Sequence, residues 1–239
     1  MKKFFKSGES KGSGRPVAYA VDSSTYEFYH NGYMILENCF DQQIRSLTQI
    51  ASQCRFYEKY HGTEDAVLRE ADCAALFELL GVGQLLDQFR RITGRMSLTL
   101  SDIALRKVYP GNRPYLNWHR DTWVYRGSCN GRVPPLIKLI FYFNADGSIV
   151  EPSLLLVKGS HRRVFGKKKV FDLGINCLFE KEVVCGGEVA GVVFASEICH
   201  KVLPPKNTET YRLIFVFSEP YQFSQFDRVE GVQSFLARK

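Results

Sequence analysis

Three side chains with the chemistry of metal ligands stand at two places in the sequence. His119 and Asp121 are separated by one residue, and His200 follows far downstream. Alternate residues of a β-strand point to the same side, so His119 and Asp121 can face one ion if they lie on a strand. Two imidazoles and one carboxylate can occupy one face of an Fe(II) ion and leave its other positions open. The spacing therefore indicates a metal site of the kind that oxygenases use.

An arginine lies inside an apolar run downstream of His200. Arg212 is followed by the five hydrophobic residues Leu213–Phe217. Because an unpaired charge inside such a strand is costly, a guanidinium at this position requires a partner. We therefore expect the side chain of Arg212 to be buried inside the fold and not to lie on the surface.

Length and composition indicate one globular domain. The chain has 239 residues, of which 45% are hydrophobic and 24% charged. It contains no stretch near the roughly 20 apolar residues that a membrane-spanning helix needs. Its seven cysteines form no CxxC pair, which favours reduced thiols and a cytoplasmic setting. We expect residues 1–16 to be a flexible basic tail, with one domain over 17–239.

The positive charge is concentrated in one segment. Between Arg106 and Lys169 there are thirteen basic residues and three acidic ones, although the whole chain carries only +7. Such a field concentrates anionic ligands. It favours an anionic small molecule, or peripheral contact with an anionic inner membrane surface. Nucleic acid is not the expected partner because no recognition motif is present.

Helices are expected mainly before residue 96. A short helix, a turn at Gly32 and a strand are predicted within 24–40. Asp41 is a plausible N-cap for a helix to about Tyr57. Two further helices are predicted at Thr63–Leu80 and Val82–Ile92, ending at Gly81 and Gly94.

Strands dominate from residue 96 to 220. The predicted strands are β-rich runs separated by Gly, Pro or Asn turns. They are Ser97–Tyr109, Ile137–Phe143, Ser153–Val157, Val183–Val184, Glu188–Phe194 and Tyr211–Phe217. This order indicates a mostly β protein: an antiparallel double-sheet barrel over 96–220, buttressed by the helices of 24–95.

Several sequence landmarks occur together in one order. They are Phe28–Leu36, Pro110-Gly111 before Trp118–Asp121, Tyr142–Asn144 before Lys158–Arg162, and Gly187-Glu188 before His200. Together they resemble the phytanoyl-CoA dioxygenase-like family of Fe(II)- and 2-oxoglutarate-dependent oxygenases, from Tyr26 to Ser218. The resemblance implies a double-stranded β-helix, the cupin-like jelly roll. It also implies Fe(II), 2-oxoglutarate as co-substrate, and O2.

The resemblance also implies roles for individual residues. His119, Asp121 and His200 would hold the metal. Arg212 would bind the distal carboxylate of 2-oxoglutarate through two hydrogen bonds, with Lys107 as a second contact. Substrate contacts are expected from Trp123, Tyr125, Asn144 and Arg120. Val202 departs from the family pattern because many relatives have a serine there that helps to bind 2-oxoglutarate.

The expected activity is hydroxylation of an unactivated C–H bond in an anionic small molecule or a lipid-linked sugar acid. In the family, halogenating members lack the carboxylate ligand, so Asp121 favours hydroxylation. Two alternatives stay open. One is a cupin-like metalloenzyme that does not use 2-oxoglutarate, and the other is a catalytically silent basic binding module. The sequence does not specify an oligomeric state.

Overall fold

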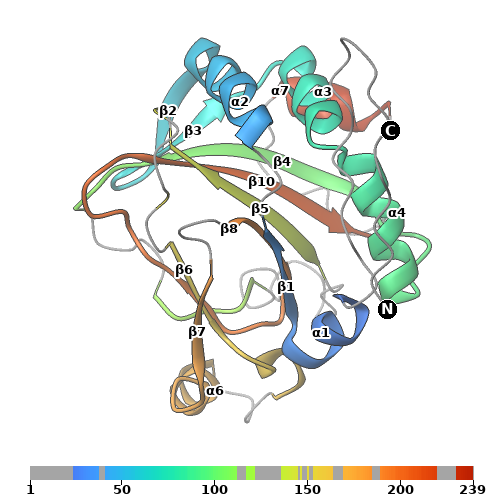
Figure 1. Ribbon diagram of the computed structural model, residues 1–239, viewed down its shortest axis with the longest axis vertical. Coiled ribbons are helices and arrows are strands. Elements are labelled where there is room, and N and C mark those ends of the chain that lie inside the picture. The colour runs from blue at the N-terminus through green and yellow to red at the C-terminus, as the bar shows by residue number, and fades with distance from the viewer. Residues whose placement is uncertain are drawn as a thin grey trace.

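Alternating hydrophobic residues build two antiparallel sheets that pack on each other (Figure 1). The computed structural model describes residues 24–37, 41–111, 117–121, 136–144, 146, 150, 153–163, 169–184, 189–219 and 230–238. Among these, seven strands form a major sheet in the order β1-β8-β5-β10-β4-β3-β2, and three form a minor sheet in the order β7-β6-β9. The predicted basic tail, residues 1–16, lies outside the described residues.

Helices alternate with short strands up to residue 93, and strands predominate from residue 99 onward. The strands are β1 (Tyr33–Glu37), β2 (Arg55–Tyr60), β3 (Thr63–Val67), β4 (Thr99–Val108), β5 (Ile137–Phe143), β6 (Leu154–Val157), β7 (Lys181–Val184), β8 (Val189–Ala195), β9 (His200–Val202) and β10 (Thr210–Ser218). The helices are α1 (Ser24–Asn31), α2 (Asp41–Gln53), α3 (Glu70–Leu79), α4 (Val82–Thr93), α6 (Lys169–Asn176) and α7 (Glu230–Leu236), with a 3-10 turn η1 (Ser160–Arg162).

The major sheet buries both of its faces. Leu139, Phe141 and Phe143 of β5 belong to the core shared with the helices, whereas Ile140 and Tyr142 belong to the core shared with the minor sheet. A strand with both faces covered reads as a nearly continuous apolar run, as β5 and β10 do. The space between the sheets, here called the barrel interior, is where functional side chains can lie out of water.

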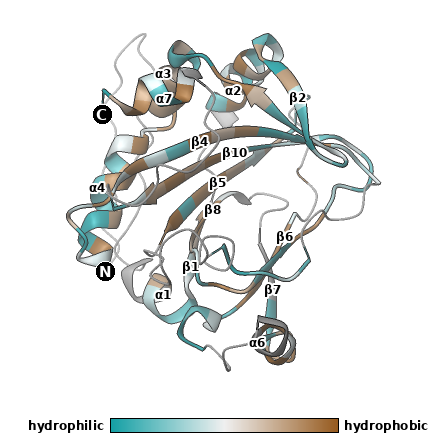
Figure 2. Ribbon diagram, turned by 180° about the vertical axis from the view of Figure 1, so that it is seen from behind, coloured by the Kyte–Doolittle hydropathy of each residue, from teal (hydrophilic) through white to brown (hydrophobic). Residues whose placement is uncertain are grey.

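Helices α2, α3, α4 and α7 cover the other face of the major sheet (Figure 1). Their apolar residues meet those of β4, β5 and β10, and Figure 2 shows hydrophobic stretches along these strands. Phe89 of α4 packs edge-on against Phe217 of β10, with 5.6 Å between ring centroids. None of the helices in the described part of the chain is long and apolar enough to span a bilayer.

The predicted helices before residue 96 are correct in part. The α1–β1 unit, with Gly32 in the left-handed region at φ 86°, is confirmed, and α4 ends at Gly94 with φ 65°. Two of the expected helices are shorter than predicted: α2 ends at Gln53 and α3 begins at Glu70, because Arg55–Tyr60 and Thr63–Val67 form a hairpin. The three aromatic residues of Arg55–Tyr60 favour a strand, and β3 extends the sheet by pairing with β4.

The strands predicted after residue 96 are confirmed to within a few residues. The bounds of β5 agree with the prediction, and β4 and β10 differ from it by one or two residues at each end. Helices α6 and α7 were not predicted from the sequence. Both are short, and α7 fits against α3 through Gly231, where an added Cβ would collide with the main chain at Leu68 and Arg69.

Replacement of Phe89 by alanine tests the helix–sheet layer. Phe89 is 1% exposed, so Phe89→Ala should lower the free energy of unfolding by about 3–5 kcal/mol through lost burial and a cavity. Met96 is 70% exposed, so the control Met96→Ala should change it by less than about 0.5 kcal/mol. Urea unfolding measures both, and equal losses would contradict the packing described here.

Candidate metal centre

A β-bridge between His119 and His200 joins the two parts of the predicted ligand set. Each residue donates its main-chain N–H to the carbonyl oxygen of the other, at 2.9 Å in both directions. The imidazole rings consequently lie side by side, with 4.0 Å between centroids. Both residues are nearly fully buried. The bridge explains why residues so far apart in sequence can act on one ion.

Main-chain carbonyls fix the orientation of both imidazoles. Nδ1 of His119 lies 2.8 Å from the carbonyl oxygen of Asn117, and Nδ1 of His200 lies 3.0 Å from that of Ile198. A carbonyl oxygen can only accept, so each Nδ1 carries the proton. In the neutral ring, Nε2 then has a free lone pair, as a metal ligand requires.

Asp121 completes the set and is 5% exposed. Its main-chain N–H donates to the carbonyl oxygen of Ser196 at 3.0 Å. The Nε2 atoms of His119 and His200 lie 3.8 Å from its Oδ1 and Oδ2, respectively. Its Oδ2 is buried without a hydrogen-bond partner in the described residues. The three ligand atoms lie within 4.8 Å of one another, so they can converge on one metal ion, which would satisfy Oδ2.

The surroundings hold these groups in metal-binding protonation states. Burial, assisted by His119, lowers the pKa of His200 to about 3. Burial by itself would raise the pKa of Asp121, but the neighbouring groups, Lys138 foremost, outweigh it and hold that pKa below its usual value. A neutral imidazole and an ionised carboxylate are the forms that bind metal.

Lys138 is a neighbour of the metal ligands that sequence reasoning missed. Its Nζ lies 2.9 Å from Oδ1 of Asp121, and its side chain is 17% exposed. On β5 it shares a face with Ile140 and Tyr142, which line the barrel interior. The sequence shows on which face of its strand Lys138 lies, but only the fold shows that Asp121 is its neighbour.

Arg212 lies on the interior face of β10 and is 2% exposed. Its Nη2 donates to the carbonyl oxygen of Leu203 at 3.0 Å, and its guanidinium lies 5.5 Å from the ring centroid of Tyr142. Its buried Nε has no hydrogen-bond partner. No carboxylate of the described residues forms an ion pair with it. A buried guanidinium with unused donors is suited to a carboxylate ligand.

Strand register places Arg212 at a suitable distance from the metal ligands. Arg212 pairs with Tyr142 across β10 and β5, and Lys138 lies four residues before Tyr142 on the same face. Four residues of strand span about 13 Å. The guanidinium extends toward Leu203, three residues after His200. The interval between Arg212 and the metal ligands can therefore hold a short dicarboxylate.

Lys107 lies on the opposite face of the major sheet, so its predicted contact with the co-substrate is wrong. It pairs with Tyr211, whereas Arg106 is the partner of Arg212. Its Nζ forms an ion pair with Glu209 at 2.9 Å. Burial by itself would lower the pKa of Lys107, but the hydrogen bond to Glu209 and the nearby groups of Tyr211, Glu209 and Tyr109 together outweigh it and raise that pKa. One residue of register decides the face of a strand.

Arg120 holds loops together, in place of the substrate contact that the sequence predicted. Its Nη1 donates to the carbonyl oxygens of Ser160, at 2.8 Å, and of Glu197, and its Nη2 donates to that of Arg163 at 2.7 Å. It is 1% exposed. As the residue between His119 and Asp121, it points away from the metal and ties the ligand strand to the η1 turn.

The other predicted substrate residues are only partly described. Asn144 is buried on the interior face, where its Oδ1 accepts from Thr210 Oγ1 at 3.0 Å. This position is compatible with the expected pocket wall, and the role stays a prediction. Trp123 and Tyr125 lie outside the described residues.

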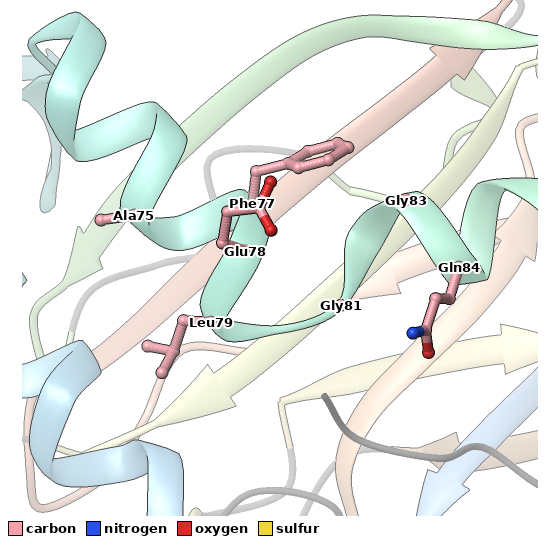
Figure 3. Close-up of a pocket in the computed structure, with 7 residues that line it drawn as sticks. All are labelled: Ala75, Phe77, Glu78, Leu79, Gly81, Gly83 and Gln84. Atoms are coloured by element: carbon pink, nitrogen blue, oxygen red, sulfur yellow. The ribbon is translucent and has the colours of Figure 1, made fainter. Parts of the chain in front are cut away.

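A surface hollow of about 560 Å³ lies away from this chemistry, beside the junction of α3 and α4 (Figure 3). It is lined by Ala75, Phe77, Glu78, Leu79, Gly81, Gly83 and Gln84. Glu78 is its one titratable group, so it offers no set of ligands or catalytic side chains comparable to the His–Asp–His site.

No protein-family model matches the sequence, and no curated protein matches it. Solved structures do match its fold. The chain resembles the epimerase SnoN from nogalamycin biosynthesis, described as non-heme and alpha-ketoglutarate dependent, with a TM-score of 0.61 at 11% identity over 88% of each chain. It resembles HygX from Streptomyces hygroscopicus, with nickel and 2-oxoglutarate bound, with a TM-score of 0.57 at 14% identity over 87% of this chain and 91% of that one.

A third match, to EvdMO1, has a TM-score of 0.58 at 16% identity and covers 83% of this chain. The chain spans only 50% of the length of EvdMO1. At such identities the comparisons establish the fold. The jelly roll predicted from the sequence is confirmed, and it is the fold of 2-oxoglutarate- and Fe(II)-dependent oxygenases.

Removal of the carboxylate tests the metal site. Loss of an outer-shell partner typically weakens metal affinity by about 10–100-fold, so loss of a ligand in Asp121→Ala should weaken Mn(II) affinity by more than about 100-fold. Asp87, exposed on α4 and paired with Arg90, supplies the control Asp87→Ala. Isothermal titration with Mn(II) measures both. An unchanged affinity in Asp121→Ala would place the metal elsewhere.

Proposed function

We propose that this protein is an Fe(II)- and 2-oxoglutarate-dependent oxygenase that hydroxylates a C–H bond of an anionic substrate. The observation that carries the proposal is a buried His119–Asp121–His200 set with Arg212 on the same interior surface, its Nε without a partner. Two histidines and a carboxylate with open positions are typical of non-heme Fe(II) oxygenases. The similar structures of SnoN, with Fe3+ and alpha-ketoglutarate, and of HygX, with nickel and 2-oxoglutarate, support it.

Each group of the chain has a defined task in this proposal. His119, Asp121 and His200 hold the metal, and Arg212 binds the distal carboxylate of 2-oxoglutarate. Bound Fe(II), 2-oxoglutarate and O2 supply the oxidising chemistry. Val202 is partly buried and packs against the apolar core between the sheets, and the main-chain carbonyl of Leu203 accepts a hydrogen bond from Arg212. The enclosing sheets keep water from the reacting groups.

The charges of the site favour an anionic substrate. Asp121, Lys138 and Arg212 together carry one net positive charge. A divalent metal and doubly charged 2-oxoglutarate cancel each other, so that charge persists when both are bound. Arg106, the strand neighbour of Arg212, is neutralised by Asp65 at 2.6 Å, and Asp102 lies two strands away from Lys138 and is partly exposed. A small anion or a lipid-linked sugar acid would complement this positive charge.

Epimerisation is a second candidate reaction, because SnoN is an epimerase of similar fold. Hydroxylation adds one oxygen atom to the product, whereas epimerisation leaves its mass unchanged. Mass spectrometry of products from a panel of anionic substrates separates the two reactions. A cupin-like enzyme without 2-oxoglutarate would form no succinate, and a silent binding module would show neither succinate nor product.

Binding of two related ligands tests the role of Arg212. Hydrogen bonds to charged groups contribute about 1.5–3 kcal/mol, so Arg212→Met should weaken 2-oxoglutarate binding to the Mn(II)-loaded protein by about 10–100-fold or more. Binding of 2-oxobutyrate, which lacks the distal carboxylate, should be unaffected by the substitution. Titration calorimetry measures both ligands. If Arg212→Met weakens both equally, Arg212 does not bind the distal carboxylate.

A further inference from the structure

Lys138 and the metal position share one carboxylate. Oδ1 of Asp121 contacts Nζ of Lys138 at 2.9 Å, whereas Oδ2 is buried and has no hydrogen-bond partner. The histidine nitrogens that face Asp121 lack protons, since each Nδ1 carries the proton for a carbonyl. Lys138 is thus the cation that neutralises Asp121 in the metal-free protein, among the residues that the structure describes.

A buried carboxylate requires such a partner. Removal of one member of a buried ion pair is strongly destabilising because it leaves the other charge uncompensated. Lys138 therefore balances the charge of Asp121 and holds its carboxylate in place before any metal arrives. The site is preformed, in contrast to sites that assemble only around their ion.

We propose that Lys138 is the counter-ion of Asp121 in the metal-free protein and competes with the metal for that carboxylate, which lowers metal affinity and keeps the ion exchangeable. This inference rests on the metal site of the proposed function. A divalent ion bound at Oδ2 lies on the same carboxylate as the ammonium group at Oδ1. Two cations this close repel each other strongly in a site shielded from water.

Competition by Lys138 and mere support by Lys138 predict opposite changes in metal affinity when the lysine is removed. If Lys138 only oriented Asp121, its loss would weaken metal binding, as loss of outer-shell partners usually does. If Lys138 competes with the metal, its loss destabilises the metal-free protein and strengthens metal binding. The metal then supplies the compensating charge that the lysine no longer supplies.

Metal arrival also changes what Lys138 can bind. The positive charge of the metal weakens the hold of Asp121 on the ammonium group, which has Asp121 as its ion-pair partner in the described residues. Lys138 lies at the end of the interior surface opposite to Arg212, four residues of strand away from Tyr142.

Mn(II) titration and thermal melting of Lys138→Met test the proposal. Methionine has a similar volume without the charge, so the variant should bind Mn(II) about tenfold more tightly or better. Its metal-free form should melt at a lower temperature than the metal-free wild type. Bound Mn(II) should remove this difference in melting temperature. Lys138→Arg keeps the charge and should retain wild-type affinity.

Lys107→Met is the matched control. Lys107 is also 2.9 Å from a carboxylate, and its side chain is 19% exposed, but it lies on the other face of the sheet. Its loss should leave Mn(II) affinity unchanged. If Lys138→Met does not fold without metal, Lys138→Gln is titrated in its place with the same expectation.

Weaker or unchanged Mn(II) binding in Lys138→Met or Lys138→Gln would overturn the competition. This failure differs from failure of the metal site itself. If the wild type binds Mn(II) and Asp121→Ala does not, the site stands and only the role of Lys138 is wrong. If wild type and Asp121→Ala bind Mn(II) alike, the proposed function fails with it.

Discussion

Two main-chain hydrogen bonds between His119 and His200 hold the candidate site together. They fix the two imidazoles side by side, with 4.0 Å between their ring centroids. The main-chain hydrogen bond from Asp121 to Ser196 holds Asp121 beside the imidazoles, and Arg120 points to the opposite side, where it binds loop carbonyls. The ligand geometry is therefore a property of the backbone, and the carbonyls of Asn117 and Ile198 add the ring orientation.

The second organising constraint is the two-sidedness of the major sheet. Every second residue of β10 and β5 packs against the helices, and the intervening ones line the barrel interior. The interior set includes two positive charges, on Lys138 and Arg212, in a mainly apolar surface. Both have a physical reason to be there only if negative charges meet them. Asp121 pairs with Lys138, and the proposed co-substrate would pair with Arg212.

The sequence was sufficient to predict the strongest features. His119, Asp121 and His200 were predicted from residue type and spacing, and burial of Arg212 followed from its apolar strand. The long strands were predicted well because hydrophobic alternation is a local signal. The β2–β3 hairpin was missed because its short, polar-rich strands owe their conformation to pairing with β4. The roles of Lys107 and Lys138 depend on register and on distant neighbours, which one sequence does not display.

The central claim is that the His119–Asp121–His200 site binds Fe(II) and 2-oxoglutarate together, with Arg212 at the far end. The most direct measurement is the visible absorption of the anaerobic protein with Fe(II), before and after addition of 2-oxoglutarate. A 2-oxo acid that chelates Fe(II) through its keto and carboxylate oxygens produces a weak metal-to-ligand charge-transfer band. We expect this band in the wild type, formed at higher 2-oxoglutarate concentration in Arg212→Met and absent in Asp121→Ala. Tight Fe(II) binding without the band in the wild type would contradict it.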